Sequence, residues 1–242
     1  DVPREVASAV AWNGFLYAVG GNDRTVKPPI QKAVVNADGS LGPWTTAGHL
    51  LQEGDCTQAV AANGYLYAVG GCDPDNGGPN GNVAWAPFLP NGDVGAFQAG
   101  PEIDIPPDNL GWRGLGSVVH AGGFLYVAGY TRSSVVLFSA LDRATGKPGP
   151  WQATTSLPTV QGVGTAFLST PTRLYVVAGA EDVFGDYRSD VYTGELASDG
   201  RVLGWNRSPY SLPIAVRGMA SGVWNGALHV VSGCNGTNYC DG

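Results

Sequence analysis

The feature that most constrains the fold of this chain is a stretch of nine residues that the sequence repeats. NGFLYAVGG at 13–21 returns as NGYLYAVGG at 63–71, and weaker copies occur at 122–130, 172–180 and 225–234. The copies align one position, which is occupied in turn by Tyr17, Tyr67, Tyr126, Tyr175 and His229. These positions are 50, 59, 49 and 54 residues apart. A period of this length indicates that one structural unit recurs along the chain.

A second marker runs in step with the first. It lies in a glycine-containing segment and is occupied by Trp44, Phe97, Trp151 and Trp205, at spacings of 53, 54 and 54 residues. Two independent markers with one period establish an internal repeat. We expect these rings to pack between neighbouring units, because large aromatic side chains dominate the burial between packed elements.

Each unit is predicted to consist of four short antiparallel strands. An apolar stretch rich in small residues, such as VASAVAW at 6–12, precedes a two-residue turn of the Asn13-Gly14 type and a second strand, FLYAVGG at 15–21. Asn-Gly and Gly-Gly favour the turns with positive φ that close tight hairpins. A variable loop, a third strand and a glycine-containing turn lead to a fourth strand. No segment has a convincing helical period.

Four-stranded antiparallel units repeated in series predict an all-β fold of the β-propeller class. The repeats span approximately 4–53, 54–112, 113–161 and 162–216, with a partial repeat at 217–242. We expect them to form a single domain over residues 1–242.

The repeat resembles the kelch repeat. A diglycine that follows an apolar strand, with a tryptophan some two dozen residues later, carries the resemblance, and Gly20-Gly21 with Trp44 match it best. It covers essentially the whole chain and implies kelch-like propeller blades. It weakens in the later units, where Gly129-Tyr130, Ala178-Gly179 and Ser232-Gly233 replace the diglycine, and the kelch tyrosine shortly before the tryptophan is absent.

About four and a half blades can be counted. Two interpretations follow: a fragment of a propeller with six or seven blades, which we favour, or a five-bladed propeller with an incomplete last blade. Exposed strand edges associate with other strands. We therefore expect the missing remainder of the propeller, or a neighbouring chain, to cover the open edges.

Charge excludes some classes of partner. The formal net charge is −7 and only 14% of the residues are charged, whereas a nucleic-acid surface is basic. No apolar run approaches the length of a membrane-spanning helix. We expect neither a nucleic-acid partner nor a membrane span.

The four cysteines predict two disulfides. The Asn63-Gly64 turn sets Cys56 nearly opposite Cys72, while Cys234 and Cys240 lie six residues apart in a turn-rich loop. Bridges of this kind indicate an oxidising compartment, so we expect an extracellular or cell-surface protein. The sequons at Asn206 and Asn235 are candidate N-glycosylation sites.

Ligand binding is expected on the variable loops, because a repeated scaffold carries its function there. The candidate ligand-binding residues are Arg113, Arg217, Trp112, Asp55, Asp108 and Glu181. The arginines precede inner strands, as Arg4 does, and a guanidinium there could clamp a carboxylate or a sugar hydroxyl. Salt bridges to loop acids are the structural alternative.

The loop with Asp73, Asp75 and Asn76 has closely spaced oxygen ligands but lacks the glutamate that ends a calcium loop, so no metal site is predicted. No catalytic motif or cofactor site is apparent, and His229, which replaces the repeated tyrosine, is expected in the core.

The leading hypothesis is a non-catalytic binding propeller that recognises a glycan or a protein. One alternative is a sugar-active enzyme of the mutarotase or cyclase type, with arginine positioning the substrate and an acid transferring protons. Another is a structural module of a larger surface or filament assembly.

Overall fold

The structure is a computed structural model. It describes residues 4, 7–22, 28–51, 56–71, 80–104, 117–128, 133–160, 164–181 and 187–235. Within these ranges every regular element is a β-strand and no helix occurs. The chain divides into two compact units, which are described separately below. Unit 1 comprises residues 1–115 and 141–149, and unit 2 comprises residues 116–140 and 150–242.

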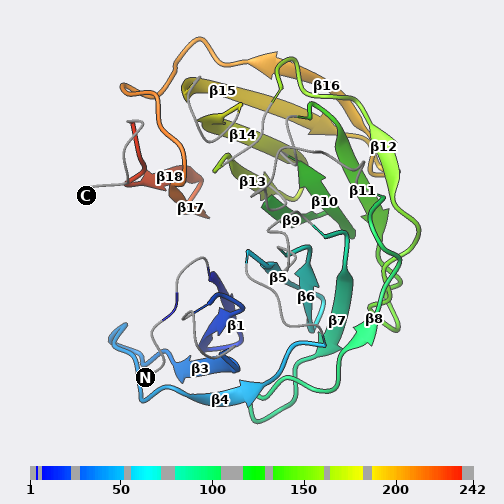
Figure 1. Ribbon diagram of the computed structural model, residues 1–242, viewed down its shortest axis with the longest axis vertical. Coiled ribbons are helices and arrows are strands. Elements are labelled where there is room, and N and C mark those ends of the chain that lie inside the picture. Colours follow the sequence, from blue (N-terminus) through cyan, green and yellow to red (C-terminus); the bar gives the residue numbers. More distant parts are fainter. Residues whose placement is uncertain are drawn as a thin grey trace. The chain divides into compact units, whose positions relative to one another are not determined.

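Unit 1 contains two four-stranded antiparallel sheets, each with its strands in chain order (Figure 1). Sheet 1 consists of β1 (Ser8–Trp12), β2 (Phe15–Val19), β3 (Ile30–Val34) and β4 (Thr45–Gly48). Sheet 2 consists of β5 (Gln58–Ala62), β6 (Tyr65–Val69), β7 (Val83–Pro87) and β8 (Gln98–Ala99).

Unit 2 contains two more sheets of this kind and a two-stranded one. Sheet 3 consists of β9 (Ser117–Ala121), β10 (Phe124–Ala128), β11 (Val136–Ala140) and β12 (Gln152–Thr154). Sheet 4 consists of β13 (Ala166–Thr170), β14 (Arg173–Ala180), β15 (Tyr187–Leu196) and β16 (Val202–Arg207). Sheet 5 consists of β17 (Ala220–Trp224) and β18 (Ala227–Val231). Repeated sheets of this form are consistent with propeller blades.

The tight turns explain the register of the inner hairpins. Asn13 and Gly14 have φ of 46° and 81°, and Asn63 and Gly64 have 51° and 86°, as a primed turn requires. The hairpin of sheet 2 pairs Gln58 with Val69, which is the register that the sequence predicts. Sheet 4 turns instead at Pro171-Thr172. Because proline fixes φ near −65°, this turn cannot be of the type I′ kind.

Small residues on the inner strands allow adjacent sheets to approach closely. Ser8 of β1 donates a hydrogen bond from Oγ to the carbonyl of Thr57, beside β5, at 3.0 Å. In unit 2, Ser117 of β9 donates to the carbonyl of Thr165 in the same way, also at 3.0 Å. A larger side chain at either position would separate the two strands. The glycine, alanine and serine content of the inner strands thus has a structural cause.

In three repeats the tyrosine is bonded to a turn of the following repeat. Its hydroxyl donates to a glycine carbonyl at 2.8 Å, and the pairs are Tyr17 with Gly92, Tyr67 with Gly146, and Tyr126 with Gly200. All three tyrosines are fully buried. Each accepting glycine lies five residues before the second aromatic marker, in the turn between the third and fourth strands. We call this contact the tyrosine latch. A buried hydroxyl requires such a partner, since leaving it unpaired costs about 1–3 kcal/mol.

The second marker also packs between sheets, as expected. Phe97 packs against the core cluster shared by sheets 1 and 2. Trp205 packs against the cluster shared by sheets 3 and 4, and its indole Nε1 donates to the carbonyl of Thr155 at 2.9 Å. Trp205 is half-buried, so its ring covers the edge of the cluster while its N–H is paired.

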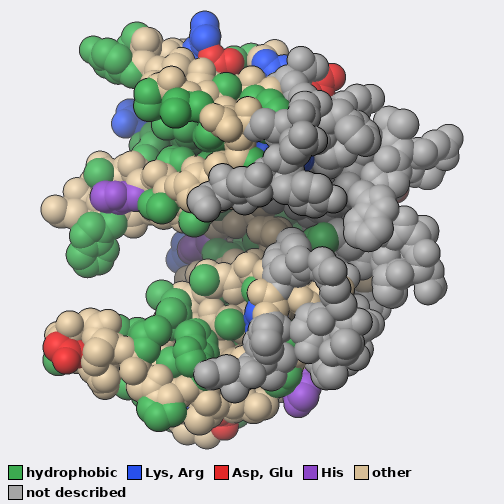
Figure 2. All heavy atoms as spheres, turned by 60° about the vertical axis from the view of Figure 1, so that its left-hand side comes forward, with side chains coloured by type: hydrophobic (Ala, Val, Ile, Leu, Met, Phe, Trp, Pro, Cys, Tyr) green, Lys and Arg blue, Asp and Glu red, His purple; other side chains and the backbone are tan. Residues whose placement is uncertain are grey.

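Sheet 5 is much less buried than the other sheets. Trp224 is 76% exposed and Val231 is 61% exposed. Figure 2 brings forward the side of Figure 1 on which this hairpin lies, and it shows hydrophobic side chains at the surface. His229 is exposed as well, so the expectation that it lies in the core is wrong. The reason is that no described residue packs over this position, whereas Tyr17, Tyr67 and Tyr126 are fully buried.

Candidate functional site

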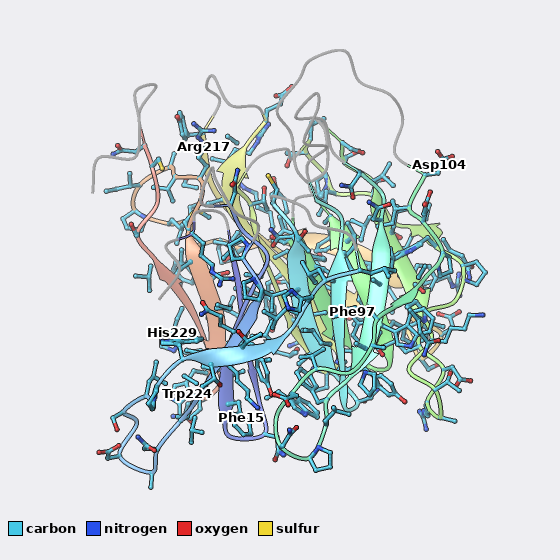
Figure 3. All side chains as sticks on the ribbon, turned by 60° about the horizontal axis from the view of Figure 1, so that its bottom comes forward. Phe15, Phe97, Asp104, Arg217, Trp224 and His229 are labelled. Carbon is cyan, nitrogen blue, oxygen red and sulfur yellow. The ribbon has the colours of Figure 1, made fainter. Side chains whose placement is uncertain are left out.

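The two candidate site residues that the structure describes, Arg217 and Glu181, lie at the same end of their sheets, which we call the loop end. Because the strands of each sheet are antiparallel and in chain order, the loop end contains the start of the first and third strands and the end of the second and fourth strands. The opposite end carries the short hairpin turns. Figure 3 shows this for sheet 5, where Arg217 lies at the loop end and Trp224 at the other. The described strand ends that lead into and out of the variable segments therefore lie at one end of each sheet.

Arg217 is the best-defined polar group at the loop end of unit 2. Its backbone forms a bridge with Cys234, with N–O distances of 3.0 and 2.8 Å, which anchors the segment before β17. Its guanidinium lies over the ring of Tyr187, 5.6 Å from the centroid. The Nε atom is buried without a hydrogen-bond partner, and no carboxylate of the described residues forms an ion pair with Arg217. The guanidinium is thus held in place by an aromatic face and keeps unused donors.

Glu181 and Arg188 form a separate pair at the same end of sheet 4. Their closest charged atoms are 3.8 Å apart, at the limit of a salt bridge. The backbone carbonyl of Arg188 accepts from the amide of Val216 at 3.0 Å, which ties β15 to the segment that carries Arg217. Because side chains alternate along a strand, Arg188 points to the opposite face from its neighbour Tyr187. Glu181 therefore pairs with Arg188 and not with Arg217.

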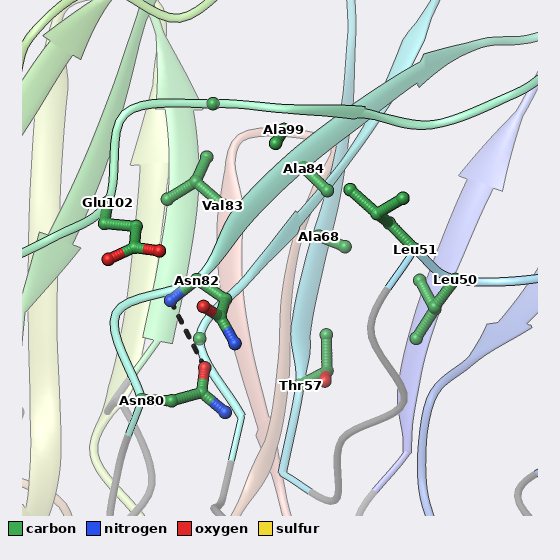
Figure 4. Close-up of a pocket in the computed structure, with 12 residues that line it drawn as sticks. Leu50, Leu51, Thr57, Ala68, Asn80, Asn82, Val83, Ala84, Ala99 and Glu102 are labelled. Atoms are coloured by element: carbon green, nitrogen blue, oxygen red, sulfur yellow. Dashed lines mark hydrogen bonds between the residues drawn. The ribbon is translucent and has the colours of Figure 1, made fainter.

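Unit 1 has a groove at the loop end of sheet 2 (Figure 4). Its apolar wall includes Leu50 and Leu51, which follow β4, and Val83 at the start of β7. Polar groups face it from Asn80 and Asn82, and the backbone N–H of Asn82 donates to Oδ1 of Asn80 at 3.2 Å. Glu102 also lines the groove, so its wall combines apolar and polar groups, and a concavity with convergent polar groups is a usual form of a binding site. The sequence did not indicate this groove, because its residues come from five separate segments.

Several predicted site residues lie outside the described residues, so their roles stay predictions. They are Arg113, Trp112, Asp55, Asp108, and the loop residues Asp73, Asp75 and Asn76. Arg4 is described, and its guanidinium donates to the carbonyls of Gly20 and Pro29 at 3.1 Å and to Gln31 at 2.6 Å. These bonds anchor the chain before β1. Arg4 is therefore a structural arginine, and its similarity to Arg217 is one of sequence position only.

Neither Cys56 nor Cys234 is a free thiol. Their expected partners, Cys72 and Cys240, lie outside the described residues, so the pairing itself remains a prediction. Peptide mapping without reduction should find Cys56 linked to Cys72 and Cys234 linked to Cys240, because the register of the sheet 2 hairpin predicts that the first two cysteines lie at the same end. A link between Cys72 and Cys234 would contradict this assignment.

Both sequon asparagines are accessible to modification. Asn206 is exposed on β16, where it is paired with Thr193 across the sheet, and Asn235 is exposed directly after Cys234. Exposure is a condition for glycosylation and does not by itself show that the sites are used.

His120 on β9 is the histidine with the clearest electrostatic perturbation. Burial lowers its pKa, and its Nε2 has no hydrogen-bond partner. The imidazole is therefore neutral at physiological pH. Within the described ranges, no group of three or more His, Cys, Asp or Glu residues has a geometry that could hold a metal ion.

The fold and loop ends define an all-β protein whose repeated four-stranded sheets are consistent with a propeller. No protein-family model matches the chain, and no curated protein matches its sequence. Solved structures do match. One of them, titled "Structure of YjhT", aligns with a TM-score of 0.69 and 16% identity, over 96% of this chain and 73% of the other. At this identity the likeness shows the fold alone. No helix in the described part of the chain is long and apolar enough to cross a membrane.

Proposed function

We propose that this protein is an extracellular binding propeller with kelch-like blades, and that it recognises a glycan or a protein through its loop ends. The observation that carries the proposal is the state of Arg217. A guanidinium has five donors in a planar fork and binds carboxylates and hydroxyls in fixed geometry. Arg217 is positioned by Tyr187 and has no acidic partner among the described residues. A buried hydrogen-bond donor without an acceptor is rare in proteins, so we expect a bound ligand to supply the acceptor.

The groove of sheet 2 supports the same proposal independently. Leu51 is 49% exposed at its rim, and the amides of Asn80 and Asn82 can pair with the polar groups of a ligand. Cys56 and Cys234 are not free thiols, which supports an oxidising, extracellular location.

The alternative of a sugar-active enzyme needs an acid or a base beside the substrate-positioning arginine. Glu181 was the described candidate for that role, and it lies against Arg188. This arrangement favours binding over catalysis at Arg217. Asp55 and Asp108 lie outside the described residues, so the two hypotheses are separated by experiment.

Replacing Arg217 by alanine should weaken the binding of a glycan-array or pull-down ligand by roughly tenfold or more, because hydrogen bonds to a charged group contribute about 1.5–3 kcal/mol. The matched control is Arg173→Ala. Arg173 is exposed at the start of β14, at the end of sheet 4 opposite the loop end, and pairs with Glu195 there, so its loss should leave binding unchanged.

Titration of each variant against the ligand that the wild-type protein selects measures the effect. Equal affinities for the wild-type protein and Arg217→Ala would contradict the proposal for this residue. Absence of any ligand, together with turnover of a small sugar that Arg217→Ala abolishes, would replace the binding function by the enzymatic one.

A further inference from the structure

The second strand of sheet 5 has a free edge. β18 pairs with β17 alone, whereas the second strand of each other sheet is paired on both sides. The comparison holds for the described residues. Val231 is 61% exposed, while Val19 and Val69, at the same position in sheets 1 and 2, are fully buried. An edge with unpaired backbone groups and apolar side chains is a template for another strand.

The tyrosine latch of sheet 4 is open. Tyr175 occupies the latch position on β14, but it is only half-buried, and within the described ranges its hydroxyl has no acceptor. The cause is topological. Each acceptor comes from the turn between the third and fourth strands of the next sheet, and sheet 5 has two strands. An acceptor is therefore missing at a defined point.

The core clusters show which side chains are missing. Sheet 2 contributes Ala86 and Val94 to the cluster shared with sheet 1, and sheet 4 contributes Tyr192 and Val202 to the cluster shared with sheet 3. These residues lie on the third strand, in the turn that follows it, or at the start of the fourth strand of the second sheet of each pair. Among the described residues, sheet 5 supplies no such member to the cluster between sheets 4 and 5. Sheet 5 supplies to it Leu228 and Val230 of β18 and Met219 before β17. Tyr175 and Val191 consequently remain partly exposed at its rim.

The four complete repeats share a turn sequence that closes this kind of gap. A glycine is followed after two residues by an apolar residue and after five by an aromatic one. The turns are Gly39-Leu41-Trp44, Gly92-Val94-Phe97, Gly146-Pro148-Trp151 and Gly200-Val202-Trp205. In the last three the glycine carbonyl is the latch acceptor.

We propose that the β18 edge is a docking site for a β-hairpin with this turn sequence. The first strand of the hairpin pairs antiparallel with β18, and its glycine carbonyl accepts the hydroxyl of Tyr175. Its apolar residue completes the cluster between sheets 4 and 5. Recognition is then by strand addition, in which main-chain bonds give affinity and side-chain pockets give specificity. This site lies on a strand edge and not at the loop end, so it is independent of the proposed ligand binding.

A peptide with the sequence of residues 187–207 is the direct probe, because it contains two strands and the Gly200 turn. It should bind the full chain in a 1:1 complex and slow amide exchange in β18. The matched control is the same peptide with Val202→Asp, which should bind at least tenfold more weakly, because it would bury an unpaired carboxylate. Calorimetry with exchange mass spectrometry makes both measurements.

The latch is tested on the protein side. Tyr175→Phe keeps the ring and removes the hydroxyl, so the peptide should bind roughly fivefold more weakly, the value of one hydrogen bond. Tyr210→Phe, at a site that is 81% exposed, should have no effect. Binding that neither Val202→Asp nor Tyr175→Phe weakens would overturn the proposal. So would β18 amides that are already protected in the free monomer, or a concentration-dependent dimer that protects them without peptide.

Discussion

Raising the pH from 10 to 11 should lower the free energy of unfolding by about 3 kcal/mol, because three latch tyrosines ionise far more easily in the unfolded chain. Burial, with a smaller contribution from Asp93, raises the pKa of Tyr17 to about 12. Burial also raises the pKa of Tyr67, and that of Tyr126 is raised by burial and then by Asp199. All three hydroxyls are hydrogen-bonded donors in the folded state.

The sign follows from proton uptake. Below pH 10 both states keep the phenols protonated, and the stability that they contribute is fully present. Between pH 10 and 12 the unfolded chain loses protons that the folded chain retains, so stability falls as the pH rises through this window. Each phenol contributes at most about 1.36 kcal/mol per pH unit. Between pH 10 and 11 it contributes about 1 kcal/mol, because the unfolded phenol is already half ionised at pH 10, so three contribute about 3.

Denaturant titrations between pH 8 and 11.5, followed by tyrosinate absorbance, measure this slope. Tyr126→Phe should remove about one third of it, because phenylalanine cannot ionise. Tyr210→Phe is the control, since Tyr210 is 81% exposed and should leave the slope unchanged. Equal slopes in the wild-type protein and in Tyr126→Phe would show that the latch tyrosines do not govern alkaline unfolding.

The hairpins were predictable from sequence because their information is local. An Asn-Gly pair with positive φ fixes the register of the strands on both sides, and Asn13-Gly14 and Asn63-Gly64 do so as expected. The sheets follow from the repetition of that signal. The same reasoning does not predict a turn at Pro171-Thr172, because no Asn-Gly or Gly-Gly pair occurs there. A turn of another type nevertheless pairs the two strands of this hairpin in the same way.

The latch was not predicted, although both of its partners stand in the repeat. Tyr17 and Gly92 are 75 residues apart, and no local rule connects them. Two features of the sequence could have indicated the latch. The glycine always lies five residues before the aromatic marker, and the tyrosine always occupies the same position of the second strand. His229 shows the opposite error, because its expected burial depends on a neighbouring sheet that no described residue supplies.

The candidate site was predictable in position but not in detail. The repeat indicates which ends of the sheets carry variable segments, and Arg217 lies there. The guanidinium of Arg217 faces the ring of Tyr187 and not an acid. This contact depends on how the start of β15 packs against the segment before β17, which is thirty residues further along the chain. Side chains at loop ends are positioned by such long-range contacts, so their partners cannot be derived from spacing.

Alanine at Gly146 should cost roughly 1–3 kcal/mol more stability than alanine at Gly39, although both glycines occupy the same turn position. Both have positive φ, 68° and 82°, so alanine meets similar backbone strain of about 1–2 kcal/mol at each. They differ in their surroundings. A Cβ at Gly146 would lie 2.5 Å from Cδ2 of Tyr65 and 2.6 Å from its Cγ, whereas nothing lies within 4 Å of a Cβ at Gly39.

The contacted atoms decide the size of this effect. Cγ is the root of the Tyr65 ring and cannot swing away as a ring edge could, and its neighbour Tyr67 must stay in place to donate to the Gly146 carbonyl. In Tyr65→Ala protein the clash is absent, so Gly146→Ala should then cost no more than Gly39→Ala. Thermal and denaturant unfolding of the two single variants and the double variant measure the difference, which corresponds to about 2–4 °C per kcal/mol in a chain of this size. Equal losses at Gly39 and Gly146 in the wild-type background would mean that the tyrosine ring does not pack against the turn, and the latch would then lack its second contact.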